Sequence, residues 1–213
     1  MLYRRGRWMQ PSYVRFGSTA WLRDAGMNAA GLGTGSRPLL CFRSALFGEI
    51  RWENMRQVLL IVDMQSTFSP PVWLVEGVRD LAQHIPSVAT IELHDEARTP
   101  FRGQLGWCPA VEDKCLVEAD KIFIEHGYGP SAETVEYLKR MNPDRVLVCD
   151  VQTETCVLAA GFSLFDAGLH PTLITDLTVG SSLDRSGRLG ISLWKHHFRQ
   201  TISKAELLPD VSV

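Results

Sequence analysis

The stretch "VLVCDVQTETCVLAAGFSLFDAG", from Val146 to Gly168, contains the strand-to-helix junction on which the fold depends. The apolar run Arg145–Asp150 has the length and composition of a strand that is buried on both faces. Thr155–Ala167 has the apolar spacing of a helix, and Gly168 follows it where helices commonly end in a left-handed residue. Cys156 lies at the seam between the two elements, in the first turn of the predicted helix.

The same alternation of short apolar runs and helical patterns extends through the chain from Met55 onward. Strands are predicted at Val58–Asp63, Ser87–Leu93, Lys121–Glu125, Arg145–Asp150, Pro171–Asp176 and, as a short one, near Gln200–Ser203. Helices are predicted at Leu74–Ile85, Ser131–Met141, Thr155–Ala167 and around Asp184–His196. This alternation indicates a parallel sheet with helices on both faces, whose ligands bind at the carboxyl ends of the strands. The side chains expected there are those of Asp63, Glu125, the segment from Asp150 to Cys156, and Asp176.

The overall composition is that of an ordinary globular protein. The 213 residues are 45% hydrophobic and 22% charged, and the net charge of −2 gives no indication of nucleic-acid binding. No apolar run approaches the roughly 18 residues that would suggest a membrane span. The five cysteines are odd in number and lack a C-x-x-C pair, which argues against a disulfide framework and an ordinary zinc site. A reducing compartment is the simplest interpretation, and we expect a cytoplasmic location.

The first 54 residues differ in character from the rest. They contain eight Arg, no Lys and three acidic residues, and they show no long amphipathic period. The segment "GLGTGS" lacks the terminal G-K-[ST] of a phosphate-binding loop, so a flexible linker is the preferred interpretation. A transit peptide is an alternative. We therefore divide the chain into a disordered or mis-called extension, residues 1–54, and a domain over residues 55–213.

The position of Cys156 suggests reactivity. Free N–H groups and a partial positive charge at a helix N-terminus favour a thiolate, and they also stabilise an oxyanion on a substrate. Asp63, at the end of another strand, is predicted to reach the same edge of the sheet and could take the thiol proton. The alternative, a buried and inert cysteine, is equally consistent with this position.

Two segments resemble the isochorismatase-like cysteine hydrolases. "LLIVDMQSTF" is similar to their opening D-x-Q-x-x-F element, and the stretch around Cys156 is similar to their G-x-x-T-x-x-C-V nucleophile segment. The resemblance implies a Rossmann-like three-layer α/β/α sandwich with a mainly parallel six-stranded sheet. It also implies an Asp–Lys–Cys triad with Asp63 as base and Cys156 as nucleophile. An oxyanion hole from the backbone N–H groups of Gln152 and Cys156, and a cis peptide between Val151 and Gln152, are implied in the same way.

The sequence departs from this pattern at two positions. Glu125 occupies the position of the family Lys, so the catalytic set expected from the resemblance is Asp63, Glu125 and Cys156. Lys121 lies roughly 13 Å away along the strand, too far for an obvious replacement. Asp150 occupies the position of the usual Gly. Nearby carboxylates raise one another's pKa and disfavour a thiolate, so these substitutions favour a protein with impaired catalysis.

The region after the second predicted strand, "ELHDEARTPFRGQLGW", bears on metal binding and on the pocket. It has one histidine and is more similar to the loop of family members without a metal, so no metal and no cofactor are expected. The aromatic side chains of Phe68, Phe101 and Trp107 are candidates for the substrate pocket, and Trp73 and Arg102 are further candidates.

These observations together predict a cysteine-dependent hydrolase of a small amide or related C–N bond, acting through a thioester intermediate. One alternative is a catalytically impaired relative that binds a small metabolite or a protein partner. A nucleotide-binding doubly wound protein is disfavoured, because no G-x-G-x-x-G follows Asp63. The expected partner is a small-molecule substrate, with no nucleic acid and no membrane, and the chain is expected to form a homo-oligomer.

A chain that begins at Met55 should fold with the same cooperativity as the full chain. The reason is that residues 1–54 lack the periodicity needed to bury apolar surface against the domain. Thermal unfolding of the two chains, followed by circular dichroism, measures this. A large drop in melting temperature on truncation would contradict it.

Overall fold

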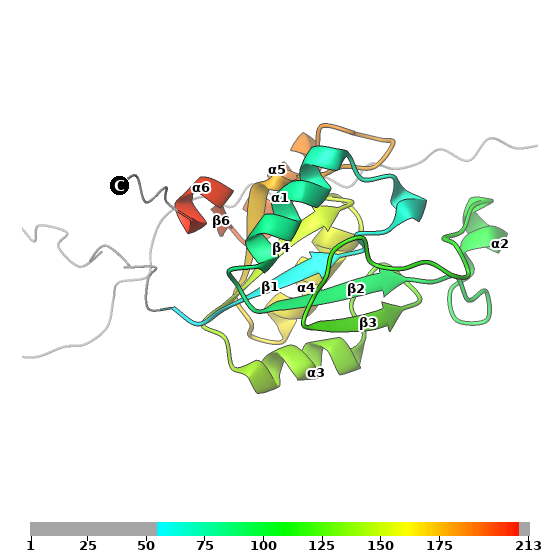
Figure 1. Ribbon diagram of the computed structural model, residues 1–213. Coiled ribbons are helices and arrows are strands. Elements are labelled where there is room, and N and C mark those ends of the chain that lie inside the picture. The colour runs from blue at the N-terminus through cyan, green and yellow to red at the C-terminus, as the bar shows by residue number, and fades with distance from the viewer. Residues whose placement is uncertain (1–54, 209–213) are drawn as a thin grey trace, which may run out of the picture. The chain divides into compact units, whose positions relative to one another are not determined.

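The structure is a computed structural model that describes residues 55–208, so the expectation for residues 1–54 lies outside the described residues. The strands are β1 (Gln57–Val62), β2 (Ser87–Glu92), β3 (Lys121–Glu125), β4 (Arg145–Val151), β5 (Pro171–Val179) and β6 (Thr201–Ile202). They form one six-stranded sheet in the order β3-β2-β1-β4-β5-β6, shown in Figure 1. Each pair of neighbouring strands is parallel. The fold class predicted from the sequence is therefore confirmed.

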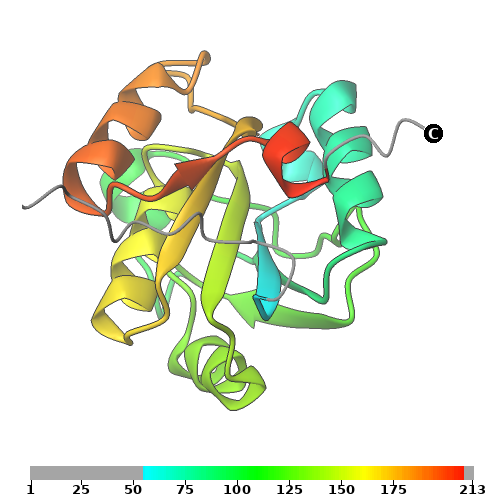
Figure 2. The same ribbon diagram turned by 90° about the vertical axis from the view of Figure 1, so that its left-hand side faces the viewer.

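Helices cover both faces of this sheet. They are α1 (Val72–Ala82), α2 (Phe101–Leu105), α3 (Ala132–Met141), α4 (Cys156–Asp166), α5 (Arg188–His197) and α6 (Lys204–Leu207), with a 3-10 turn at Ser66–Phe68. The apolar side chains of α3, α4 and α5 share one hydrophobic cluster with one face of the sheet, and those of α1 and α6 pack with the other. Figure 2 shows α1 and α6 on one side of the strands and α4 and α5 on the other. None of the helices in the described part of the chain is both long and apolar enough to cross a membrane.

The order of the strands determines at which edge of the sheet the candidate site lies. The chain builds outward from β1 to β2 and β3, and then returns to add β4 on the other side of β1. This reversal makes the carboxyl ends of β1 and β4 a switch point, the usual place of ligand binding in open parallel sheets. Asp63 follows β1 and Cys156 begins the helix after β4, so both lie at this edge.

Local signals in the sequence account for the element ends. Ser131 caps α3, since its hydroxyl accepts a hydrogen bond from the N–H of Thr134 at 3.3 Å. Gly168 lies in the left-handed region with φ of 77°, as predicted for the residue after α4. The short elements η2, α2 and α6 were not predicted, because three to five residues show no resolvable period. β5 extends beyond its predicted end to Val179, so Asp176 is an exposed residue within the strand.

Asp150, which occupies the position of the family Gly, is an anomaly within β4. Its φ of 98° is one that glycine adopts far more readily than a residue with a Cβ atom. The register with β5 shifts between Val148 and Asp150. The carboxyl group is 0% exposed, and neither of its oxygens has a hydrogen-bond partner among the described residues. Burial, followed by the charge of Asp63, raises the pKa of Asp150 well above its usual value.

Replacing Asp150 with Gly should therefore raise the free energy of unfolding at neutral pH by about 1–3 kcal/mol. It removes an unpartnered buried carboxyl group and relieves the positive φ. As pH rises above about 4, an unfolded Asp loses its proton while the buried one keeps it, which favours unfolding. The gain should thus shrink as pH falls toward 4.

Denaturant unfolding of wild type and Asp150→Gly at several pH values measures both effects. Asn142→Gly is the matched control, because Asn142 also has a positive φ, 49°, but lies exposed at the end of α3. That variant should change stability less and without the pH dependence. An Asp150→Gly protein no more stable than wild type at neutral pH would contradict the prediction.

Candidate active site

Asp63 is the buried carboxylate at the end of β1. The chain turns at this residue with φ of 57°, and the Thr90 hydroxyl donates a hydrogen bond to Oδ1 at 3.0 Å. Burial raises the pKa of Asp63 to about 7, and the charge of Glu125 adds to this rise. Hydrogen bonds from Cys156 and Thr90 act in the opposite direction. Asp63 is therefore a base with a pKa close to neutral pH.

Cys156 is the first residue of α4, and its side chain is only 3% exposed. Its Sγ lies 3.9 Å from Oε2 of Glu92, and Sγ and one oxygen from each of Asp63 and Glu92 lie within 4.8 Å of one another. Burial, and then the two carboxylates, raise the pKa of the thiol well above its usual value. The resting group is therefore a thiol, despite its place at a helix N-terminus.

Glu92, the last residue of β2, completes this group, although the sequence analysis did not single it out. The side-chain amide of Gln65 holds it in place: Nε2 donates to the Glu92 carbonyl at 3.1 Å, and Oε1 accepts from the Glu92 N–H at 2.5 Å. Burial, and then the charge of Asp63, raise the pKa of Glu92 to about 8. Its place at the carboxyl end of a predicted strand is the signal that could have identified it.

Glu125 occupies a different environment from the one that the resemblance implies for the family Lys. Its carboxylate accepts hydrogen bonds from the Ser131 N–H at 2.8 Å and from the Thr134 hydroxyl at 2.5 Å, at the start of α3. The structure thus brings Asp63 and Cys156 together but directs Glu125 toward α3. Lys121 lies at the opposite end of β3, with its Nζ 5.2 Å from the centre of the Phe123 ring.

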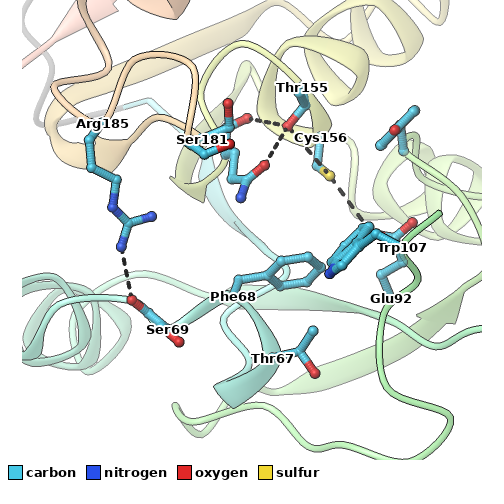
Figure 3. A pocket seen from close by; sticks show the side chains of 12 residues that line it. Thr67, Phe68, Ser69, Glu92, Trp107, Thr155, Cys156, Ser181 and Arg185 are labelled. Carbon is cyan, nitrogen blue, oxygen red and sulfur yellow. Dashed lines mark hydrogen bonds between the residues drawn. The ribbon is translucent and has the colours of Figure 1, made fainter. Parts of the chain in front are cut away.

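A pocket of about 600 Å³ opens beside the thiol. Figure 3 shows Cys156 and Glu92 on one side of it and Arg185 on the other. The lining residues are Thr67, Phe68, Ser69, Glu92, Trp107, Tyr128, Gln152, Thr155, Cys156, Ser181, Ser182 and Arg185. Two of the three predicted aromatic residues, Phe68 and Trp107, therefore line the pocket, and Tyr128 was not foreseen.

The other candidate pocket residues lie outside the lining. Phe101 is buried behind it, where its ring packs edge-on against Trp107 at 6.0 Å and against Tyr128 at 5.4 Å between ring centres. Phe101 thus supports two pocket walls. Trp73 is half exposed on α1, and Arg102 on α2 donates a hydrogen bond to the sulfur of Cys108.

Gln152 and Cys156 are the residues whose N–H groups are predicted to form the oxyanion hole, and both line the pocket. The peptide between Val151 and Gln152 is cis, as the family resemblance implies. The Gln152 carbonyl accepts hydrogen bonds from the N–H groups of Thr155 and Val157, which directs it toward the start of α4.

The donor atoms of Asp63, Glu92 and Cys156 are close enough to share a metal ion. Within residues 55–208 they are the one group of at least three such side chains. The set contains no imidazole, because His94 instead has its Nε2 3.3 Å from Oε2 of Glu96. The thiol is also held in its protonated form, whereas a metal binds the thiolate. The site therefore fits proton transfer better than metal binding.

Glu92→Gln should lower the pKa of the Cys156 thiol, because it removes one of the two anions that oppose the thiolate. Alkylation by iodoacetamide at a pH of about 9, where Glu92 is ionised, should be slow in wild type and faster in Glu92→Gln, by about tenfold for each unit by which the thiol pKa falls. The pH dependence of the alkylation rate measures that pKa, with Cys156→Ser as the blank for the other thiols.

Glu125→Gln is the matched control for this measurement. Its carboxylate is bound to the start of α3, so the substitution should change the thiol pKa less than Glu92→Gln does. A larger effect from Glu125→Gln would instead place Glu125 beside the thiol and contradict the assignment of Glu92.

Comparison with known proteins supports the same family. The model of the Isochorismatase domain family matches residues 96–206, which is more than half of the chain. A comparison with curated proteins gives no match.

Solved structures share the fold at low sequence identity. A nicotinamidase/pyrazinamidase from Acinetobacter baumanii is 18% identical, with a TM-score of 0.61 over 73% of this chain and 100% of that one. A cysteine hydrolase from Pseudomonas syringae is 16% identical, with a TM-score of 0.60 over 71% of this chain and 90% of that one. An N-carbamoylsarcosine amidase from Thermoplasma acidophilum is 15% identical, with a TM-score of 0.59 over 71% and 98% of the two chains. The family match, over more than half of the chain, leads to one conclusion: the chain belongs to the Isochorismatase domain family.

Proposed function

We propose that the protein is a cysteine hydrolase that cleaves a small amide or a related C–N bond. The observation that carries this proposal is the position of the Cys156 sulfur, at the pocket and in contact with two buried carboxyl groups of raised pKa. Perturbed ionisable groups beside a nucleophile in a pocket are typical of active sites. Relatives of the same fold carry names of amide-cleaving enzymes, which is consistent with the reaction class.

Asp63 and Cys156 perform the first step. The ionised Asp63 carboxylate takes the thiol proton as Sγ forms a bond to the substrate carbonyl carbon. A thiol with a raised pKa can act in this way because its proton leaves during the attack. The negative charge that develops on the carbonyl oxygen is directed toward the N–H groups of Gln152 and Cys156.

Glu92 is the proton donor in this proposal, because its carboxyl group faces the Cys156 sulfur at 3.9 Å. Its pKa of about 8 lies above the value of about 7 for Asp63, so near neutral pH one carboxyl group is ionised and its neighbour is protonated. The acid protonates the departing nitrogen, and a thioester remains on Cys156. Water then attacks the thioester and gives one proton to Glu92, and Asp63 returns its proton to the departing sulfur as the carboxylic acid product leaves.

A second candidate function is binding without turnover. It is favoured by the rise in the thiol pKa, since burial and two neighbouring carboxylates oppose the thiolate, which is the nucleophilic form. The pocket would then retain a small ligand beside Cys156 without cleaving it. Measurement of turnover decides between the two functions.

Hydrolysis should be detectable as ammonia release from a panel of small amides by the full chain. The rate should rise with pH as Asp63 loses its proton near 7 and fall as Glu92 loses its proton near 8, which gives a narrow bell-shaped profile. Cys156→Ser and Asp63→Asn should each lower kcat/KM by about 10³-fold or more.

Cys108→Ser is the matched control, because Cys108 is a thiol outside the pocket lining, and this variant should retain full activity. Turnover that survives Cys156→Ser would refute the thiol as nucleophile. Binding of an amide with no ammonia release at any pH would favour the second function.

A further inference from the structure

We propose that the pocket takes a substrate with a cationic reactive group, an amidinium or a guanidinium, and that Glu92 is its counter-ion. The inference rests on the proposed function, since Cys156 remains the nucleophile, and it narrows the substrate to one chemical class. It also explains how the site could operate without the lysine that the family resemblance implies.

An unpartnered carboxyl oxygen provides the first evidence. Glu92 lines the pocket but is only 1% exposed, and its Oε1 has no hydrogen-bond partner in residues 55–208. The other oxygen, Oε2, faces the Cys156 sulfur at 3.9 Å. A buried carboxyl oxygen that accepts no hydrogen bond lowers the stability of the folded protein. A ligand N–H group placed against Oε1 would donate the missing hydrogen bond.

No Lys or Arg in residues 55–208 places a positive charge beside this group of side chains. Burial, Asp63 and Cys156 are the influences on the charge of Glu92, and no Lys or Arg of the described chain is among them. Arg185, which also lines the pocket, donates to the backbone carbonyls of Ser69 at 3.1 Å and Gly180 at 3.4 Å. It lies across the pocket from Glu92 in Figure 3. Within residues 55–208 no positive charge acts on Glu92, so a cationic ligand would supply the one that is missing there.

Aromatic walls suit a flat cation. Phe68, Trp107 and Tyr128 line the pocket together with Glu92. Phe101 packs edge-on against Trp107 and Tyr128, which fixes two of these rings. The faces of aromatic rings attract cations, and planar amidinium groups also stack on them. Their paired N–H groups further match the two oxygens of a carboxylate.

Protonation sets the condition for this binding. The pKa of Glu92 is about 8 in the free protein, so near neutral pH a cation must displace a proton to pair with it. The titratable groups that face Glu92 are Asp63 from the end of β1, Cys156 from α4, and Tyr128. Cation binding should therefore be strongest above a pH of about 8, where Glu92 is ionised without the ligand.

The reaction balances for an amidinium as it does for an amide. Sγ bonds to the amidinium carbon, one C–N π pair moves to nitrogen, and Asp63 receives the thiol proton. That proton returns to the nitrogen that leaves as ammonia, and a cationic thioimidate remains on Cys156. Water adds to the same carbon and the C–S bond breaks; one proton of the water goes to the departing sulfur, and the other goes to the ammonia. The sum is amidinium plus water giving amide plus ammonium, and the neutral amide no longer pairs with Glu92.

The test compares two ligands of nearly equal shape and different charge, benzamidine and benzamide. Their binding to the full chain carrying Cys156→Ser is measured by calorimetry at a pH of about 8.5, where Glu92 is ionised and benzamidine keeps its charge. We expect benzamidine to bind at least tenfold more tightly than benzamide. In the double variant with Glu92→Gln this preference should disappear, whereas Glu125→Gln in place of Glu92→Gln should preserve it.

The melting temperature of each variant, measured without ligand, verifies that it is folded. Equal binding of the two ligands, or tighter binding of benzamide, would overturn the inference and make Glu92 a proton donor to a neutral carbonyl. A preference for benzamidine that survives Glu92→Gln would also overturn it, because the counter-ion would then lie elsewhere.

Turnover separates this inference from the proposed function. If wild type releases ammonia from neutral amides in a Cys156-dependent reaction but shows no preference for the cation, the proposed function stands and the inference is wrong. If benzamidine binds through Glu92 and neither ligand is cleaved, the charge preference stands and the proposed hydrolysis of these compounds is wrong. Cys156-dependent release of ammonia from benzamidine would support both.

Discussion

Two buried carboxyl groups and a buried thiol share a space in which their reactive atoms lie within 4.8 Å of one another. None of the three can ionise without raising the cost of ionising the other two, because little water reaches them and no Lys or Arg of the described chain offsets their charge. The chemistry of the site follows from this constraint. The three groups share protons. A ligand that enters the pocket therefore contacts either an ionised carboxylate, which favours a positive charge, or a protonated carboxyl group, which can donate a hydrogen bond.

The sheet maintains this arrangement against repulsion. Asp63 and Glu92 follow or end neighbouring parallel strands, and Cys156 begins the helix after β4, so the backbone places all three at one edge. Gln65 fixes the backbone of Glu92 with two hydrogen bonds, and Thr90 fixes the carboxylate of Asp63. The free-energy cost of placing these groups together is thus offset by the stability of the packed core beneath them, which is common in active sites.

Three buried carboxyl groups, two of them at the positions that depart from the family pattern, have different surroundings. Glu125 is satisfied by the start of α3, so its carboxylate has a structural role in the present fold. Asp150 is buried without a partner and in a backbone conformation suited to glycine. Glu92 has one oxygen without a partner, and that oxygen belongs to a residue of the pocket. Of the three, only Glu92 lies where a ligand in the pocket could supply the missing hydrogen bond.

Much of this protein could be inferred from its sequence, because the determining signals are local. Buried parallel strands read as continuous apolar runs, and residues at their carboxyl ends must meet at one edge, so the fold class and the pairing of Asp63 with Cys156 were predictable. The turn after α4 followed from Gly168, and the cap of α3 from Ser131. The extent of β5 was not predictable in the same way, since it depends on a shift of its register against β4.

Only the tertiary structure decided which of the two strand-ending glutamates faces the thiol. Glu92 and Glu125 both end strands, and they pair with each other in the register of β2 and β3, so nothing in the sequence distinguishes which one faces the thiol. The start of α3 binds the carboxylate of Glu125, which therefore does not face the thiol. Gln65 binds only the backbone of Glu92, so the Glu92 carboxyl group is left facing Cys156. Glu92 meets Gln65 and Cys156 across 27 and 64 residues of sequence, and a strand pattern predicts where a side chain lies but not which group it contacts.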